Sequence, residues 1–537
     1  MSSTANPQPA TPSVARSAFL VAAAILLSRI AGLVRGRILA RFFGLSYVAD
    51  AFAAALRIPN ILQNLFGEGV LSASFIPVYA RLLAEGKRED AGRVAGAVFS
   101  LLALATSLLV LAGVLTTPWL ITVIAPGFRG ETRQLAIQLV RIFFPGVGLL
   151  VLSAWCLGIL NSHRRFFLSY VSPVVWNVTI IVALLVFGRR VAMSQLAVTA
   201  AWASVIGSAL QFLIQLPVVF RLAPAIRFFF SSISDHVRAV LRTFGPVFIA
   251  RGVVQLSAYI DAFLASYLPT GAVAALTNAQ ALYVLPVSLF GMSVSVAELP
   301  AMSSALGNEQ EVAGTLRQRI ASSTRRIAFF VVPSAVAFLA LGDVIAGAIY
   351  QNKMFTHADT IWVWGILAGS AVGLVASTVG RLYSSAYYAL RDTRTPLRFA
   401  IVRVALTTVL GCLFALPKGA PFMPAILGID ARWGTAGLTA SAGFAAWIEF
   451  LLLRRGMNQR IGRVEMPFVY FAKLWGSATL AAGVGWGLRL AFPLQRPIVN
   501  AFVILLPYGL AYLALTTLMG IEQARDLARQ VWRRVGI

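Results

Sequence analysis

Residues Val98–Leu115 read VFSLLALATSLLVLAGVL and contain no charged side chain. A helix needs about 20 apolar residues to cross a bilayer, and runs of this kind recur along nearly the whole chain. Of the 537 residues, 59% are hydrophobic and only 12% are charged, whereas soluble proteins carry roughly 25% charged residues. The sequence therefore predicts an all-α polytopic membrane protein rather than a soluble fold.

Apolar runs counted between polar or Pro/Gly breaks predict about 14 transmembrane helices. We expect two pseudo-symmetric six-helix lobes, residues 14–220 and 221–456, then two extra helices within 457–520 and a cytoplasmic tail, 521–537. Residues 1–13 are polar and Pro-rich, and we expect a disordered tail there rather than a signal peptide. The predicted spans lie near residues 14–44, 48–83, 92–117, 132–160, 168–188, 195–220, 239–268, 272–305, 318–341, 358–389, 397–416, 434–454, 468–491 and 498–518.

A weak internal repeat favours the two lobes. Internal repeats in transporters place the substrate site where the repeats meet, and they favour alternating access by rocking. The alternative is chance recurrence of Pro and Gly in a chain with 43 glycines. The repeated pattern is a proline, then Phe-Gly, then a second proline: Pro59, Phe66-Gly67 and Pro77 in the second span, and Pro286, Phe290-Gly291 and Pro300 in the eighth.

The net charge of +26 does not indicate a nucleic-acid partner, because the basic residues lie mainly in short loops between apolar spans. Such loops set membrane orientation, and the strongest ones fall on one side if spans alternate. We therefore expect an even number of spans and both termini in the cytoplasm, although Arg189 and Arg190 argue against this orientation. The strongest basic loops hold Arg81, Lys87, Arg88 and Arg93; Arg221, Arg227, Arg238 and Arg242; Arg317, Arg319, Arg325 and Arg326; and Arg454, Arg455, Arg460 and Arg463.

Motifs of catalysis and metal binding are missing from the sequence. It contains no Walker loop, no dinucleotide fingerprint and no His-Glu-x-x-His helix, and its three histidines fall in separate loops. Cys156 and Cys412 both lie in apolar spans, which supports neither a disulfide nor a metal cluster. We expect a transporter rather than an enzyme, with no cofactor, driven by coupled Na⁺ or H⁺, by the membrane potential or by substrate supply.

Arginines in the first two spans are the main candidates for substrate binding. An arginine at the bilayer centre costs about 2.5–3.5 kcal/mol, so Arg29, Arg35 and Arg57 need a common reason. A guanidinium matches phosphate by bidentate hydrogen bonding, and we expect pyrophosphate as the ligand. Asp50 and Glu68 are candidate exchangeable ion-pair partners. The alternatives are arginines that extend to lipid headgroups near helix ends, which we favour for Arg37 and Arg41, and a structural salt bridge for Glu68.

The seventh and eighth predicted spans carry a second group of charges. Arg251 and Asp261 are ten residues apart, and therefore face different directions on a helix, while Glu298 lies in the next span. Asp261 is a candidate for binding a coupling cation or a proton; the alternative is a helix-end carboxylate facing the outer water. We interpret four further charges near predicted span ends as interfacial or structural: Arg141, Arg381, Arg403 and Glu449.

The N-terminal part carries a dense series of motifs: Ser28-Arg29-Ile30-x-Gly32-x-x-Arg35, Phe43-Gly44, Asp50-Ala51-Phe52, Arg57-Ile58-Pro59-Asn60, Phe66-x-Glu68-Gly69 and Ser74-Phe75-Ile76-Pro77-Val78. This series strongly resembles the MurJ/MviN family of lipid II flippases, and weaker similarity continues along essentially the whole chain. In the terms of this resemblance, Arg29 and Arg35 match cavity arginines, Asp50 and Glu68 match acidic positions, and Arg57 occupies a basic position.

The resemblance implies the fold of the multidrug/oligosaccharidyl-lipid/polysaccharide exporters, with a cationic central cavity and a lipid-tail groove at helices 13 and 14. It also implies the cargo, an undecaprenyl-pyrophosphate-linked peptidoglycan precursor carried to the periplasmic face of the bacterial inner membrane. Expected partners are this lipid-linked anionic glycan, membrane lipids and cell-wall synthesis enzymes.

Several family charges are missing from this chain. Gln63 and Asn64 stand where an arginine is common, Gly36 replaces an acidic residue, and Ala281 and Val284 lie where an Asp-Arg pair and a Glu are frequent. Either Arg251 substitutes from a neighbouring helix or the substrate differs. Two alternative functions therefore stay open: an exporter of another polyprenyl-linked oligosaccharide or of a drug-like cation, and a non-transporting scaffold for envelope assembly.

Overall fold

The computed structural model describes residues 12–62, 65, 69–226, 235–303, 309–416, 423–492 and 496–535, and the statements below concern these residues. The residues described fall into two compact units, each presented by itself. Unit 1 comprises Met1–Phe43 with Tyr47–Tyr259, and unit 2 comprises Gly44–Ser46 with Ile260–Ile537. The lobe boundaries expected from the sequence stay a prediction, and most of the expected N-terminal tail lies outside the described residues.

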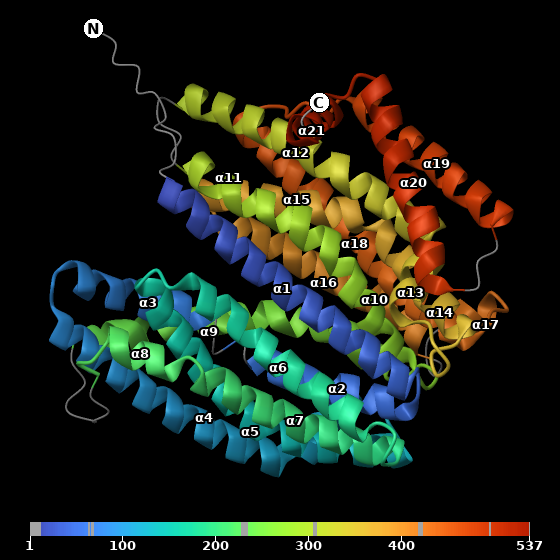
Figure 1. Ribbon diagram of the computed structural model, residues 1–537. Helices are drawn as coiled ribbons and strands as arrows, with labels where there is room; N and C mark the ends of the chain where they lie inside the picture. The colour runs from blue at the N-terminus through green and yellow to red at the C-terminus, as the bar shows by residue number, and fades with distance from the viewer. Residues whose placement is uncertain are drawn as a thin grey trace, which may run out of the picture. The chain divides into compact units, whose positions relative to one another are not determined.

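Every regular element in the described ranges is helical (Figure 1). The helices that begin in unit 1 are α1 (Pro12–Phe43), α2 (Tyr47–Leu62), α3 (Gly69–Ala84), α4 (Arg88–Ile124), α5 (Gly130–Ser162), α6 (Phe166–Phe187), α7 (Met193–Leu213), α8 (Leu216–Leu222) and α9 (Asp235–Ala265). The elements of unit 2 are α10 (Ala272–Pro286), η2 (Val287–Met292), α11 (Ser293–Ser303), α12 (Glu309–Ala340), α13 (Gly342–Tyr350), α14 (His357–Val372), α15 (Leu374–Ala389), α16 (Arg394–Ala415), α17 (Met423–Ile426), η3 (Ala431–Trp433), α18 (Gly434–Ile461), α19 (Phe468–Ala491), α20 (Pro497–Leu518) and α21 (Glu522–Val535).

The described part of the chain contains nine helices long and apolar enough to cross a membrane, or ten if the bent pair α14 and α15 forms one span. The predicted all-α polytopic membrane fold is therefore confirmed, while the count of 14 spans stays a prediction. Large apolar side chains on these helices face outward, for example Leu115 and Trp119 on α4 at 68% and 78% exposure. Such exposure is expected of surfaces whose solvent is lipid.

Unit 1 is built around α5, which packs against α2, α4 and α7 (Figure 1). Trp155 of α5 is fully buried and donates its indole N–H to the Ala95 carbonyl of α4 at 3.0 Å. A buried polar contact joins α5 to the end of α7, where the Gln211 and Gln215 amides donate to Ser153 Oγ at 3.1 and 2.7 Å. Because an unpaired polar group in an apolar interior is costly, these bonds fix which faces of the helices meet.

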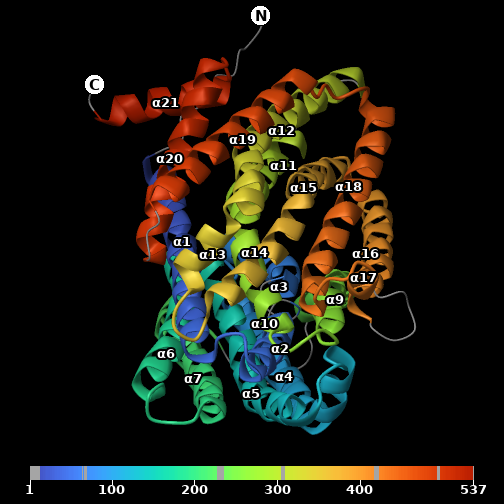
Figure 2. The same ribbon diagram turned by 90° about the vertical axis from the view of Figure 1, so that its right-hand side faces the viewer.

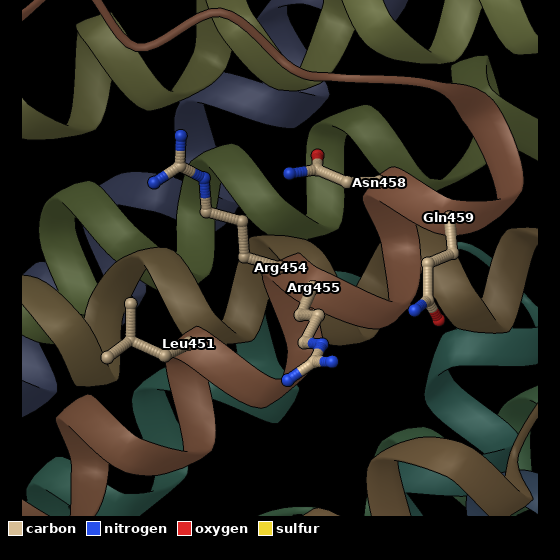
Figure 3. Close-up of a pocket in the computed structure, with 5 residues that line it drawn as sticks. All are labelled: Leu451, Arg454, Arg455, Asn458 and Gln459. Carbon is tan, nitrogen blue, oxygen red and sulfur yellow. The ribbon is translucent and has the colours of Figure 1, made fainter.

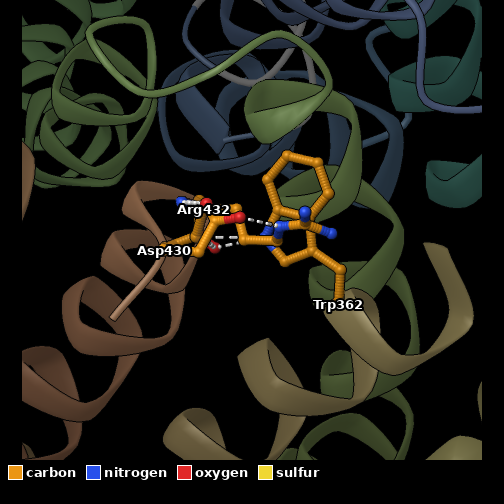
Figure 4. Close-up of polar contacts among 4 residues, drawn as sticks. Trp362, Asp430 and Arg432 are labelled. Atoms are coloured by element: carbon orange, nitrogen blue, oxygen red, sulfur yellow. Dashed lines mark hydrogen bonds and ion pairs between the residues drawn. The ribbon is translucent and has the colours of Figure 1, made fainter. Parts of the chain in front are cut away.

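Unit 2 contains a broken helix, and two glycines approach each other closely at the break. α14 and α15 meet at Gly373 with a bend of 44°. A side chain at Gly373 would collide with the backbone of Gly443 on α18, so the absence of Cβ atoms lets the two helices touch. Near the start of α14, the Trp362 indole donates to the Arg432 carbonyl at 2.9 Å, next to an Arg432–Asp430 ion pair of 2.9 Å (Figure 4).

Helices α19 and α20 run side by side in unit 2 (Figure 2). Tyrosines attach α20 to α12: Tyr508 donates to the Pro333 carbonyl at 2.6 Å, and Tyr512 donates to the Phe329 carbonyl at 2.7 Å. The carbonyl of Phe329 is free to accept because Pro333, four residues later, has no N–H to donate. A helix-interior proline thus creates the acceptor that the neighbouring helix uses.

Candidate functional site

Arg35 of α1 is the candidate residue whose surroundings the structure defines best. Its guanidinium lies over the indole of Trp176 on α6, with Arg35 Cζ 4.6 Å from the ring centroid. The Arg35 Nε and Nη1 atoms are buried, and neither has a hydrogen-bond partner among the described residues. Helix α1 thus presents a permanent cation to an aromatic face without a hydrogen-bonded counter-ion at these two nitrogens.

Trp176 is itself held in place by α7. Its indole N–H donates to the Ser204 carbonyl at 3.1 Å and to Ser204 Oγ at 3.0 Å. The Gly207 backbone lies against the same residue, and a Cβ there would come within 3.1 Å of Trp176. The aromatic platform beneath Arg35 is therefore fixed by a neighbouring helix before any ligand arrives, which is the kind of preorganisation that a binding site needs.

The energy balance at Arg35 favours an external anion. Burying an ion costs several kcal/mol even after the protein relaxes. A desolvated cation–π contact stabilises the charged group by only about 2 kcal/mol. The buried guanidinium nitrogens also lack the hydrogen bonds that usually offset such burial. A phosphate or pyrophosphate group would supply both the missing charge and the missing acceptors, and its geometry matches the guanidinium fork.

Asp50 and Arg57 share one face of α2. They are seven residues apart, which is about 10 Å along a helix and two turns in rotation. Asp50 is buried, with 3% of its surface exposed, and Arg57 is half-buried. The Tyr259 hydroxyl of α9 donates to the Arg57 carbonyl at 3.2 Å, which attaches α9 to this turn of α2.

The other predicted site residues remain predictions. Arg29 is exposed on α1, and Asp261 is partly exposed on α9 in unit 2. Glu68 and the side chain of Arg251 lie outside the described residues, as do the Gln63 and Asn64 substitutions. Within α1, Arg29 is exposed, whereas Arg35 contacts Trp176.

Two ion pairs in unit 2 join charged side chains on neighbouring helices. Arg403 Nη1 of α16 donates to Glu449 Oε2 of α18 at 3.2 Å, and Arg381 of α15 interacts electrostatically with both. The interpretation of these residues as interfacial or structural stays a prediction, and the Arg403–Glu449 ion pair is compatible with a structural role. Arg403 lies nine residues after the start of α16, and Glu449 lies 12 residues before the end of α18. Glu298 of α11 similarly receives a bond of 3.2 Å from Arg319 of α12.

The sequence analysis missed two contacts of charged side chains, one in each unit. Trp176 lies in an apolar run that gives no sign of a cationic neighbour 141 residues earlier. Asp343 at the start of α13 forms an ion pair of 2.7 Å with Arg489 of α19, and only 4% of the aspartate side chain is exposed. The signal that could have found the second pair is a charged residue in each of two largely apolar segments, since isolated intramembrane charges require partners.

Long apolar helices with charged side chains among them define an integral membrane protein. The model of the family described as lipid II flippase MurJ matches residues 39–508. A Burkholderia cenocepacia lipid II flippase MurJ is 29% identical over 95% of this chain and 98% of its own length. A Rhizobium tropici protein named a probable lipid II flippase MurJ is 31% identical over 75% of each chain.

Solved structures agree with the sequence relatives. A lipid II flippase MurJ in an inward closed conformation is 25% identical, with a TM-score of 0.77 over 95% of this chain and all of the other. An inward-facing multidrug resistance transporter of the MATE family shares the fold alone, with a TM-score of 0.65 and 17% identity over 82% of this chain and 98% of the other. The chain belongs to the MurJ family of lipid II flippases.

Proposed function

We propose that this protein is a lipid II flippase that moves undecaprenyl-pyrophosphate-linked peptidoglycan precursor from the cytoplasmic to the periplasmic leaflet. The proposal includes alternating access as the mechanism, the bacterial inner membrane as the location, and both termini in the cytoplasm. The observation that carries it is the Arg35 guanidinium, buried on Trp176 without hydrogen-bond partners at Nε and Nη1. Family membership supplies the class of cargo, and the pyrophosphate of that cargo is the anion that this guanidinium fits.

The other candidate residues have supporting roles in the proposal. Arg29 and Arg57 extend the recognition of phosphate, and Asp50 and Glu68 provide counter-charges when no cargo is bound. Arg251 replaces a family charge that this chain lacks. Asp261 is the candidate for a coupling Na⁺ or H⁺, because a carboxylate in a membrane-spanning helix is costly unless it binds a cation or a proton.

Complementation tests this function directly. The full chain should support growth of a bacterium depleted of its own lipid II flippase, and Arg35→Ala should abolish that growth. Arg41→Ala is the matched control: Arg41 lies on the same helix, is exposed, and also contacts an aromatic ring, with Cζ 5.9 Å from the Phe42 centroid. Equal growth with Arg35→Ala and Arg41→Ala, at equal protein levels in the membrane, would contradict the proposed role of Arg35.

Export of a different polyprenyl-linked glycan is the second candidate function. The substitutions at Gly36, Gln63, Ala281 and Val284 favour it, because they remove charges that family members commonly have. Identification of the lipids that co-purify with the chain separates the two candidates. Lipid II supports the first, another lipid-linked glycan supports the second, and envelope enzymes without any lipid-linked glycan would support a scaffold.

A further inference from the structure

The last turns of α18 in unit 2 border an open groove of about 500 Å³. Leu451, Arg454, Arg455, Asn458 and Gln459 line it (Figure 3). These positions are three, four, seven and eight residues after the first, so they form a continuous stripe along one side of the helix. The stripe begins with an apolar side chain, continues with two guanidinium groups and ends with two amides.

The two arginines of this stripe are not neutralised within the described part of the chain. Neither Arg454 nor Arg455 forms a salt bridge there, and Arg454 Nε is buried without a hydrogen-bond partner. Their neighbour Arg460 behaves differently, since it forms an ion pair of 2.6 Å with Asp392 and lies over the Tyr387 ring. Arg454 also interacts with the side chain of Tyr383, which is a neutral partner, so both arginines are left without a counter-charge in the described part of the chain.

Asn458 adds a donor of fixed orientation. Its Oδ1 atom accepts the backbone N–H of Val464 at 3.1 Å, so its amide N–H₂ points the other way. In Figure 3 that nitrogen is turned toward the side on which the Arg454 guanidinium lies. Two neighbouring side chains thus present N–H donors, and neither has a counter-charge among the described residues, which suits the oxygens of a phosphate.

The position of the stripe indicates which phosphate it meets. The candidate span that contains α18, Ala431–Ile461, has 31 residues, or about 46 Å of helix against a hydrocarbon core of about 30 Å. Part of the span must therefore lie outside the hydrocarbon core, and we place its last turns there because most of its charged residues are in these turns. Phe444 and Leu451, seven residues apart on one face, are exposed at 55% and 52%. The order along this face, apolar side chains and then cations, matches acyl chain and then phosphate in a phospholipid.

We propose that Leu451, Arg454, Arg455 and Asn458 form a binding site for the headgroup of an anionic phospholipid such as phosphatidylglycerol. The ligand is a bilayer component rather than the transported cargo, so the site is independent of the proposed function. A bound lipid would neutralise the two arginines and hold the end of α18 at the membrane surface.

Native mass spectrometry of the detergent-purified full chain tests this site by counting bound phosphatidylglycerol and phosphatidylcholine. Each basic residue at an anionic membrane surface contributes about 1 kcal/mol, so Arg454→Ala/Arg455→Ala should weaken phosphatidylglycerol binding by at least about tenfold. Arg238→Ala/Arg242→Ala is the matched control, because it removes two exposed arginines from α9 and should retain the bound lipid. Unchanged thermal unfolding of both variants establishes that they fold.

Three results would overturn the proposal. The first is equal phosphatidylglycerol binding by wild type and Arg454→Ala/Arg455→Ala. The second is equal binding of phosphatidylcholine and phosphatidylglycerol, which would remove the role of the anionic headgroup. The third is displacement of the lipid by millimolar inorganic phosphate, which would indicate a site for free phosphate. Arg454→Lys/Arg455→Lys should bind with intermediate affinity, because lysine keeps the charge and loses the bidentate fork.

Discussion

Arg35 in unit 1 and Arg403 in unit 2 lie at similar depth in their helices but have opposite surroundings. Arg35 is eight residues from the end of α1, and Arg403 is nine residues from the start of α16. The first guanidinium rests on an indole with two nitrogens unbonded, whereas the second donates to Glu449. The first charge has no counter-ion at these two nitrogens, and the second is neutralised by the protein itself.

This difference separates two uses of a buried arginine. An internally paired cation contributes to how helices pack, and removal of its partner leaves an uncompensated charge. An unpaired cation destabilises the empty protein and gains its counter-charge only when a ligand binds, so natural selection retains it for binding rather than for stability. The comparison therefore predicts opposite responses to mutation at the two sites.

Replacement of Arg35 should have the largest functional effect. Arg35→Leu removes the side chain proposed to bind pyrophosphate and should lower the rate of lipid II flipping in proteoliposomes by at least about 100-fold, since a charge-assisted bidentate contact contributes about 3 kcal/mol. The thermal unfolding temperature of the empty protein should stay the same or rise, because a buried unpaired charge has been removed. A lower unfolding temperature with intact flipping would show that Arg35 is structural.

Removal of the partner of Arg403 should have the opposite effect on stability. Glu449→Gln should destabilise the protein by about 1–3 kcal/mol, less than for a fully buried pair because 39% of the Arg403 side chain is exposed. Thermal unfolding in detergent measures this loss, and the double variant Arg403→Leu/Glu449→Leu should recover much of it. The exposed pair Arg93–Glu89 is the control: Glu89→Gln should change stability by less than about 0.5 kcal/mol. Equal losses of stability for Glu449→Gln and Glu89→Gln would contradict a stabilising role for the Arg403–Glu449 pair.

The aromatic platform allows a finer test of Arg35. Trp176→Leu keeps an apolar side chain but removes the ring face, and the lost cation–π contact is worth about 0.5–2 kcal/mol. We expect lipid II affinity to fall about 3- to 30-fold. The lipid II affinity of Trp176→Phe should fall less, because this variant keeps a ring and loses only the indole hydrogen bonds to Ser204. Affinities measured by titration into nanodiscs would contradict the model if the leucine and phenylalanine variants bound equally.

Replacement of Asp392, a charged loop residue that is paired within the protein, should have the smallest effect. Hydrogen bonds from the Thr395 hydroxyl and backbone N–H, with help from Arg460, lower the pKa of Asp392 to about 2. Because the folded pKa lies below the ordinary value of 3.8, the stabilisation is present above about pH 4 and is lost as the pH falls toward 2. Asp392→Asn should cost about 0.5–1 kcal/mol at pH 7 and only a small part of that at pH 2, as measured by unfolding at both pH values. A pH-independent difference would contradict this.

The helices could be predicted from the sequence because a helix that crosses a lipid bilayer needs a long apolar run. The predicted span 468–491 coincides with α19, and 498–518 differs from α20 by one residue. The α14–α15 break was less visible, because Gly373 at this break approaches Gly443, which lies 70 residues later in the chain. The arginines were found by their cost in a membrane.

The partners of these charged residues could not be predicted from the sequence, because tertiary contacts decide which residues pair. No local pattern relates Arg35 to Trp176, Arg403 to Glu449, or Asp343 to Arg489, and each pair joins residues 46 or more positions apart. Sequence could therefore indicate that charges in the spans matter, but not which of them the protein neutralises. That distinction decides which arginine is a candidate for binding cargo.

Direct binding of purified lipid II to the full chain in nanodiscs tests the central claim most directly. Wild type and Arg35→Ala should differ by at least about tenfold in affinity, while Arg41→Ala should bind as wild type does. The same comparison with the undecaprenyl-linked monophosphate should show a smaller difference, because one phosphate fewer is available. Indistinguishable lipid II affinities for wild type and Arg35→Ala, with both proteins folded, would contradict the account.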